Sequence, residues 1–166
     1  MATLELYLIR HGLAADRGEE YPDDSQRPLT SEGITRLRRE AKALDALGVG
    51  IEHIITSPLA RTKQTADVFA ETMKSKPSVS MSDALAPAGT PAAVIDELAR
   101  HMRKGTIGLV GHEPNIGELA ARLIGARVPL AFKKGAICRL DFEVFPPKGL
   151  GQLRWFITPR MLRLMS

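Results

Sequence analysis

Short apolar runs alternate with longer amphipathic segments along most of the chain, and this alternation limits the folds that it can adopt. The apolar runs that predict strands cover residues 4–10, 51–57, 78–82 and 106–112. The segments with apolar residues at helical spacing cover residues 29–48, 60–74, 90–105 and 113–125. Strands that alternate with helices predict a mainly parallel sheet that is covered by helices on both faces.

Residues with strong capping preferences stand where two of these helices are expected to begin. Thr30 or Ser31 is the N-cap candidate of the first helix, and Thr90 followed by Pro91 marks the start of the third. Gly105 is the expected stop of that third helix. These signals support the division of the chain into strands and helices.

The C-terminal part of the chain has a different pattern. Residues 135–144 and 151–159 both read as strands, and the turn-rich residues 145–151 between them predict an antiparallel hairpin. A last short helix is expected over residues 160–166. The expected fold is a single domain, residues 1–166, with a three-layer α/β/α sandwich. Its central sheet is mostly parallel and ends in the C-terminal antiparallel hairpin.

Charge and cysteine content exclude several classes of protein. The net charge of +4 comes from scattered Lys and Arg without interleaved aromatic residues, and only 5% of the chain is aromatic, which argues against nucleic-acid binding. No apolar stretch approaches the roughly 20 residues that span a bilayer. The N-terminal segment lacks the basic region of a secretory signal, and Cys138 is the single cysteine. We therefore expect a cytoplasmic protein with no nucleic-acid or membrane partner, whose basic surface attracts an anionic small molecule or an acidic partner.

Charged and titratable side chains follow three of the predicted strands, at the points where those strands end. Arg10 and His11 follow the first strand. Arg61 opens the helix after the second strand, and His112 ends the strand of residues 106–112. Ligands of parallel α/β sheets bind outside the carboxyl ends of the strands, so these four side chains are expected to converge.

This set of residue types suits the transfer of a phosphoryl group without a metal. The guanidinium forks of Arg10 and Arg61 can bind phosphate oxygens in pairs and stay charged at any working pH. A neutral imidazole can attack phosphorus, and a second, protonated imidazole can hold an oxygen in the transition state. Each residue also has an ordinary structural explanation, but their joint placement at three strand ends favours a phosphate site.

A metal centre is the alternative use of the histidines. His11, His53 and His112 lack the spacing of a metal-binding motif. Arg10, next to His11, would repel a divalent cation. His53 is expected to be a core or strand-edge residue, and His101, among charged neighbours, is expected to be solvated. The sequence therefore predicts no metal and no other cofactor.

Three blocks of the sequence resemble the signature blocks of the histidine phosphatase superfamily, which has the phosphoglycerate-mutase-like fold. They read LYLIRHG, TSPLARTKQTA and LVGHEPNIGEL, and they lie in the family's order between residues 4 and 121. The short chain and the segments RPLTSEG and LAPAG resemble most the SixA subgroup of bacterial phosphohistidine phosphatases. The resemblance implies that His11 is the nucleophile that becomes phosphohistidine and that His112 is a second histidine at the same phosphate oxygens. It also implies that Arg10 and Arg61 clamp the phosphate, that no metal takes part and that water releases the phosphate.

The chain departs from the family's pattern at the general acid, a Glu or Asp that many members carry shortly after the third strand. Asp83 lies before the expected turn, and Thr90 stands near the place of the acid. A general acid accelerates the loss of an alkoxide roughly 10²–10⁴-fold, whereas an imidazole nitrogen is a less basic leaving group. The acids of the first loop are the remaining candidates, although a solvated loop is the simpler explanation for them: Asp16, Glu19, Glu20, Asp23 and Asp24.

Three hypotheses for the function follow. The leading one is a metal-independent phosphatase that removes phosphate from phosphohistidine on a protein. The missing acid favours it, and so does the short segment between Arg61 and His112, which has no room for a large lid insertion. The alternatives are a phosphomonoesterase of small phosphate esters and a catalytically idle phosphate-binding module. A mutase is less favoured, because it needs a pocket for two phosphates. The sequence assigns no oligomeric state.

Overall fold

A computed structural model describes residues 3–101, 103, 105–144 and 147–165. Within these residues one six-stranded sheet has the strand order β3-β2-β4-β1-β5-β6. Its strands are β1 (Leu4–Arg10), β2 (His53–Thr56), β3 (Ser78–Met81), β4 (Thr106–Gly111), β5 (Ile137–Phe142) and β6 (Gln152–Ile157). The first four pair in parallel, whereas β5 runs antiparallel to both β1 and β6. The predicted mostly parallel sheet with an antiparallel C-terminal pair is confirmed.

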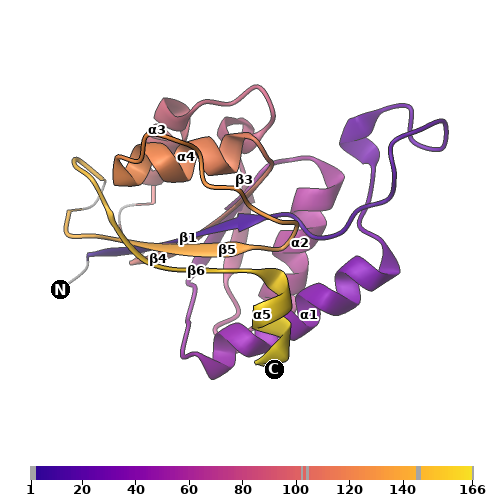
Figure 1. Ribbon diagram of the computed structural model, residues 1–166, viewed down its shortest axis with the longest axis horizontal. Helices are drawn as coiled ribbons and strands as arrows, with labels where there is room; N and C mark the ends of the chain where they lie inside the picture. The colour runs from indigo at the N-terminus through magenta and orange to yellow at the C-terminus, as the bar shows by residue number, and fades with distance from the viewer. Residues whose placement is uncertain (1–2, 102, 104, 145–146, 166) are drawn as a thin grey trace.

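Helices cover both faces of this sheet, as the alternating pattern predicts. They are α1 (Ser31–Ala46), α2 (Ala60–Thr72), α3 (Pro91–Ala99), α4 (Asn115–Ile124) and α5 (Pro159–Leu164), with 3-10 turns η1 (Asp24–Gln26) and η2 (Asp83–Leu85). Figure 1 shows α3 and α4 on one side of the sheet and α1, α2 and α5 on the other, which gives the three expected layers. None of the helices in the described part of the chain has both the length and the apolar character that crossing a membrane requires.

The side chains of β1 divide between the two faces of the sheet, because successive residues of a strand point to opposite sides. Leu4, Leu6 and Leu8 pack into an apolar cluster with side chains of α3 and α4. Tyr7 and Ile9 pack into a second cluster with side chains of α1 and α2. All five are at most 1% exposed, and the full burial of one such side chain contributes roughly 1.5–3 kcal/mol. Packing on both faces therefore holds β1, and with it the residues that follow β1, inside the sheet.

Two predicted caps form at the helix starts. Thr30 Oγ1 accepts a hydrogen bond of 2.9 Å from the Gly33 backbone N–H at the start of α1. Thr90 Oγ1 accepts one of 3.2 Å from the Ala93 N–H at the start of α3, where Pro91 is the first helical residue. Each cap satisfies one of the backbone donors that a helix start leaves unpaired.

The third helix is shorter than predicted. α3 ends at Ala99 rather than near Gly105, because the backbone N–H groups of residues 100–101 bond to carbonyls three residues earlier and tighten the turn. The His101 ring lies on the ring of His53, with centroids 4.5 Å apart. Because the His101 side chain is only 20% exposed, the prediction that it is solvated is wrong. His53 itself is buried within β2, as expected. The predicted third helix, hairpin turn and last helix include residues outside the described ones, namely 102, 104, 145–146 and 166.

Gly33 is required where the first turn of α1 meets the segment that follows β1. A Cβ on Gly33 would lie 2.2 Å from the backbone carbonyl oxygen of Leu13. Alanine favours a helix by roughly 1 kcal/mol over glycine, but no side-chain rotation relieves a clash with backbone. We expect Gly33→Ala to lower the free energy of unfolding, measured with urea, by about 1–3 kcal/mol. Gly50→Ala is the matched control, because no heavy atom lies within 4 Å of a Cβ there; equal stability of the two variants would contradict the prediction.

Candidate functional site

The carboxyl ends of β1 and β4 lie side by side at one edge of the sheet. Arg10 pairs with Gly111 at the end of the ladder, and the His11 N–H extends it by donating to the Gly111 carbonyl (3.1 Å). His112 comes directly after β4. β2 is the other neighbour of β4, and α2, which follows β2, carries Arg61 in its first turn. The sheet thus brings the four predicted residues to one edge.

These residues line a single pocket of about 260 Å³. Its lining consists of Arg10, His11, Asp16, Arg17, Arg27, Arg61, His112, Glu113 and Lys134. Five of the nine are Lys or Arg and only two are acidic, so the pocket suits an anion.

The ring of His11 is fixed in one tautomer. Its Nδ1 lies 2.8 Å from the Gly12 carbonyl oxygen, which can only accept, so Nδ1 carries the proton and Nε2 keeps its lone pair. Burial, with smaller contributions from the neighbouring His112, Arg61 and Arg10, lowers the pKa of His11 to about 3 against the effect of the Gly12 hydrogen bond. His11 is therefore a neutral imidazole at pH 7, the form that can act as a nucleophile.

His112 stands beside His11, with ring centroids 5.4 Å apart. Its Nε2 lies 2.8 Å from the Ser57 hydroxyl oxygen, which already accepts a bond from the Leu59 N–H (3.3 Å). Because this hydroxyl still has its one proton to donate, we assign it as the donor to Nε2, and the proton of the neutral His112 ring is then on Nδ1. Burial, helped by the charge of Arg61, lowers the pKa of His112 to about 4. His112 is therefore a neutral imidazole near pH 7 in this geometry, and its protonation in the transition state, which the sequence analysis expects, stays a prediction.

Oxygen atoms of the protein already accept hydrogen bonds from the guanidinium groups of Arg10 and Arg61. Arg10 Nη1 donates to the Phe132 carbonyl (2.8 Å). Arg61 Nη1 and Nη2 donate to the backbone oxygen and the carboxylate of Asp24 (2.9 and 3.0 Å). Burial lowers the pKa of both guanidinium groups, which nonetheless stay charged. Some of the guanidinium N–H groups that are predicted to bind phosphate oxygens therefore donate to the protein itself.

Three buried N–H groups of the pocket have no hydrogen-bond partner among the described residues: Arg10 Nε, Arg61 Nε and His112 Nδ1. An unpaired buried donor costs roughly 1–3 kcal/mol, and native proteins keep few of them. Three such donors on the lining of one pocket can all be satisfied by a single anion with several oxygens, such as a phosphoryl group.

One of the candidate acids, Asp16, lines the pocket, and a second, Asp24, contacts the pocket residues Arg27 and Arg61. Partial burial would raise the pKa of Asp24, but the hydrogen bond from Arg27 and the charge of Arg61 outweigh it and lower that pKa, so Asp24 is an anchor rather than a proton donor. Asp16 is exposed and lines the pocket, and it is the loop acid whose place allows proton donation. Glu113 also lines the pocket, but its two oxygens accept bonds from backbone N–H groups.

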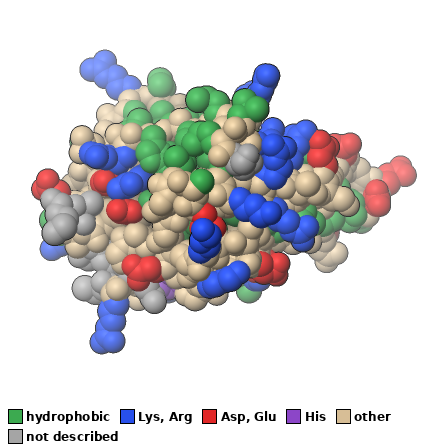
Figure 2. Space-filling model, turned by 90° about the horizontal axis from the view of Figure 1, so that it is seen from below, with side chains coloured by type: hydrophobic (Ala, Val, Ile, Leu, Met, Phe, Trp, Pro, Cys, Tyr) green, Lys and Arg blue, Asp and Glu red, His purple; other side chains and the backbone are tan. Residues whose placement is uncertain are grey.

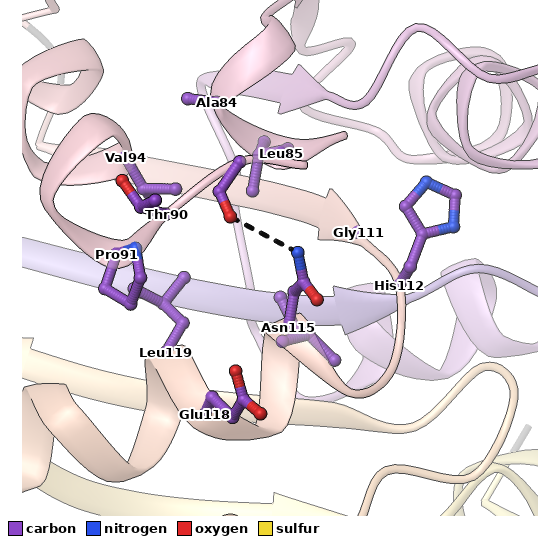
Figure 3. Close-up of a pocket in the computed structure, with 12 residues that line it drawn as sticks. Ala84, Leu85, Thr90, Pro91, Val94, Gly111, His112, Asn115, Glu118 and Leu119 are labelled. Carbon is purple, nitrogen blue, oxygen red and sulfur yellow. Dashed lines mark hydrogen bonds between the residues drawn. The ribbon is translucent and has the colours of Figure 1, made fainter. Parts of the chain in front are cut away.

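A small apolar recess of about 30 Å³ adjoins His112 on the side where the family's acid is expected (Figure 3). Thr90, in its lining, caps α3. Asn115 Nδ2 donates to the carbonyls of Pro87 and Gly89 (3.0 and 3.4 Å) and ties their loop to α4. Glu118 is the only acid among its twelve described lining residues, and its carboxylate lies away from His112 in this view. Asp83 is not among these residues.

Sequence reasoning missed three cations of the pocket. Arg27 is 7% exposed and donates to the Ala15 carbonyl (2.8 Å). Arg17 lies in the loop between β1 and α1, and Lys134 lies in the loop between α4 and β5. The rule that ligand-binding residues follow the carboxyl ends of strands does not find these cations, because loop residues follow no periodicity. Only Arg27 had a local sequence signal for its place, because it lies directly before Pro28 and shortly before Thr30, the N-cap of α1.

Comparisons with known proteins agree with this geometry. The family model described as "Histidine phosphatase superfamily (branch 1)" matches residues 6–86. An uncharacterized protein of Picosynechococcus is 42% identical over 119 residues, which are 70% of this chain and 71% of that protein. The phosphohistidine phosphatase SixA of Escherichia coli is 27% identical over 163 residues, which are 97% of this chain and 98% of SixA. A solved structure of the protein histidine phosphatase SixA with tungstate superposes with a TM-score of 0.83 at 27% identity, covering 95% of this chain and 98% of that one. The chain belongs to the histidine phosphatase superfamily.

The two buried imidazoles should make the fold sensitive to acid. Their pKa values are about 3 and about 4 in the folded protein, against about 6.5 in an unfolded chain. Between these values the unfolded chain binds more protons, so the free energy of unfolding falls as the pH falls from about 6.5 towards 4. The loss is at most about 1.4 kcal/mol per pH unit for each imidazole.

Urea unfolding at pH 7 and pH 5 tests this expectation. The double variant His11→Asn/His112→Asn should lose clearly less stability between the two pH values than the unchanged protein, and each single variant should lie between them. Equal losses in all four proteins would contradict the assigned protonation states.

Proposed function

We propose that this protein is a metal-independent phosphatase that works through a phosphohistidine intermediate on His11 and acts on phosphohistidine in a protein. The observation that carries the proposal is the set of three unpartnered buried donors, from Arg10, Arg61 and His112, on the lining of the pocket that holds the neutral His11 ring. A phosphoryl group supplies the acceptors that these donors lack.

In the proposed first step His11 Nε2 attacks phosphorus, and the bond from phosphorus to the leaving nitrogen or oxygen breaks. The phosphoryl group is then bound to Nε2, and the electron pair leaves with the departing group, which takes a proton. Arg10 Nε, Arg61 Nε and His112 Nδ1 donate to the phosphoryl oxygens, whose charge they stabilise without reorganisation. In the second step water attacks phosphorus and the bond between phosphorus and Nε2 breaks, so Nε2 regains its lone pair. The water gives up one proton, which replaces the proton that the departing group took from solvent, and inorganic phosphate leaves.

The proposed substrate class rests on the leaving group. Glu118 is the only acid among the described residues that line the recess near Thr90, and its carboxylate lies away from His112 in Figure 3. Asp24 is held as a carboxylate by arginines. An imidazole nitrogen leaves without the strong proton donor that an alkoxide needs. The similarity to SixA, a phosphohistidine phosphatase, supports the same class. The second candidate is a phosphomonoesterase of small esters. The exposed place of Asp16 at the pocket favours it, because Asp16 could supply the proton that an alkoxide needs.

Phosphate release in the presence of EDTA tests the proposal, with a chemically phosphorylated histidine peptide and p-nitrophenyl phosphate as the two substrates. We expect fast release from the peptide and slow release from the ester. His11→Ala should lower turnover of the peptide by at least about 10³-fold, yet still bind inorganic phosphate, because the three donors remain.

Each other result has a definite meaning. Comparable rates on both substrates would identify a small-molecule phosphatase with Asp16 as the acid to test. Phosphate binding without release from either substrate would identify an idle binding module. Turnover that survives in His11→Ala would overturn the mechanism.

Ser57 is expected to position His112 rather than to touch the substrate. Its hydroxyl holds the His112 tautomer that presents Nδ1–H to the pocket, so Ser57→Ala should lower kcat/KM on the phosphorylated peptide roughly 10-fold, or about 1.4 kcal/mol. It should also weaken inhibition by inorganic phosphate.

Thr62→Ala is the matched control for this variant. Thr62 is a fully buried hydroxyl that bonds to the Ser57 and Leu59 carbonyls without contact to His112. An equal loss of kcat/KM in both variants would mean that Ser57 acts only on the fold.

A further inference from the structure

A second, larger groove lies directly beside the phosphate pocket. Its volume is about 540 Å³, and it runs between α1, the start of α5 and the loop before β5. Arg10 and Lys134 line both the groove and the pocket, so the two hollows adjoin each other. A substrate whose phosphate lies against His11 therefore has the groove as its neighbouring surface.

The groove has an apolar floor and a basic rim, and we name it the basic groove. Leu37, which is buried, and Leu13, which is half-buried, form apolar parts of the lining. Arg36, Lys133 and Arg160 line it as exposed cations. Figure 2, which views the molecule from the side of α1 and α5, shows Lys and Arg side chains around a hydrophobic area.

Part of the positive charge of the basic groove has no acidic partner, although Arg36 pairs with Glu32. Within the part of the chain that the structure describes, Lys133, Lys134 and Arg160 form no ion pair. Glu40 is the one acid of the lining, it is 1% exposed, and it accepts a bond from Arg163 (3.3 Å). Burial raises the pKa of Glu40 to about 8, so it adds little negative charge near pH 7.

We infer that the basic groove docks an acidic segment next to the phosphorylated residue of a protein substrate. Carboxylates of the segment pair with Lys133 and Arg160, and an apolar side chain packs on Leu13. The inference rests on the proposed function, because the phosphorylated residue lies in the adjoining pocket. A small phosphate ester fills the pocket of about 260 Å³ without reaching the groove, whereas a protein segment covers both.

Two histidine-phosphorylated peptides that differ only in their flanks test the inference, one with four glutamates and one with four glutamines. The unchanged protein should have a kcat/KM at least 10-fold higher on the glutamate peptide, mainly through a lower KM, and added salt should reduce this preference. Lys133→Glu/Arg160→Glu should abolish the preference and leave turnover of p-nitrophenyl phosphate within about twofold, since neither residue lines the phosphate pocket.

Lys74→Glu/Arg127→Glu makes the same change of net charge outside both hollows and is the matched control. This variant should keep most of the preference for glutamates. Equal kcat/KM on the two peptides, or an equal loss of preference in both double variants, would overturn the inference.

Fluorescence anisotropy with the unphosphorylated, labelled peptides separates this inference from the proposed function. If neither phosphorylated peptide is hydrolysed, the proposed function fails. The groove inference then stands only if the glutamate peptide binds more tightly than the glutamine peptide and Lys133→Glu/Arg160→Glu removes that difference. Tighter binding of a single-stranded RNA oligonucleotide than of the glutamate peptide would overturn it in favour of a nucleic-acid surface.

Discussion

The parallel pairing of β1 with β4 is the contact on which the arrangement of the pocket depends. It aligns Arg10 with Gly111 and sets His11 and His112 one residue beyond the ends of two neighbouring strands. Apolar side chains on both faces of β1 hold that register, because a slip of one residue would turn Leu6 and Leu8 into the wrong cluster. The positions of the two imidazoles are thus a consequence of core packing many ångströms away from the pocket.

The pocket concentrates cations and imidazoles in a place where water is scarce. Such a site forces the two imidazoles to be neutral and keeps the arginines charged, and the protein stabilises the arrangement with oxygens of its own. The Phe132 carbonyl accepts a hydrogen bond from one amino group of Arg10, and Asp24 accepts hydrogen bonds from both amino groups of Arg61. Among the buried nitrogens of the pocket residues, Arg10 Nε, Arg61 Nε and His112 Nδ1 have no partner in the described part of the chain, and these groups indicate the chemistry that the pocket can perform.

Much of this could be predicted from the sequence, and the failures have identifiable physical reasons. Strand ends and helix starts follow from apolar periodicity, so the places of Arg10, His11 and His112 could be derived from local patterns. The protonation of His112 could not, because it depends on burial and on Arg61, which come from distant parts of the chain. The stacking of His101 on His53 is likewise a tertiary contact that overrides the polar character of the surrounding sequence.

Arg10 and Arg61, two of the four arginines that line the pocket, are held by different loops. Arg10 is tied to the segment before β5, and Arg61 to the loop between β1 and α1 through Asp24. That second loop is joined to itself by short backbone bridges, Ala14 with Leu29 and Gly18 with Tyr21, so its outer end projects beyond its anchor. A change in length or composition at this projecting end therefore leaves the hydrogen bonds between Asp24 and Arg61 in place, so the loop tip and the phosphate clamp are structurally separate.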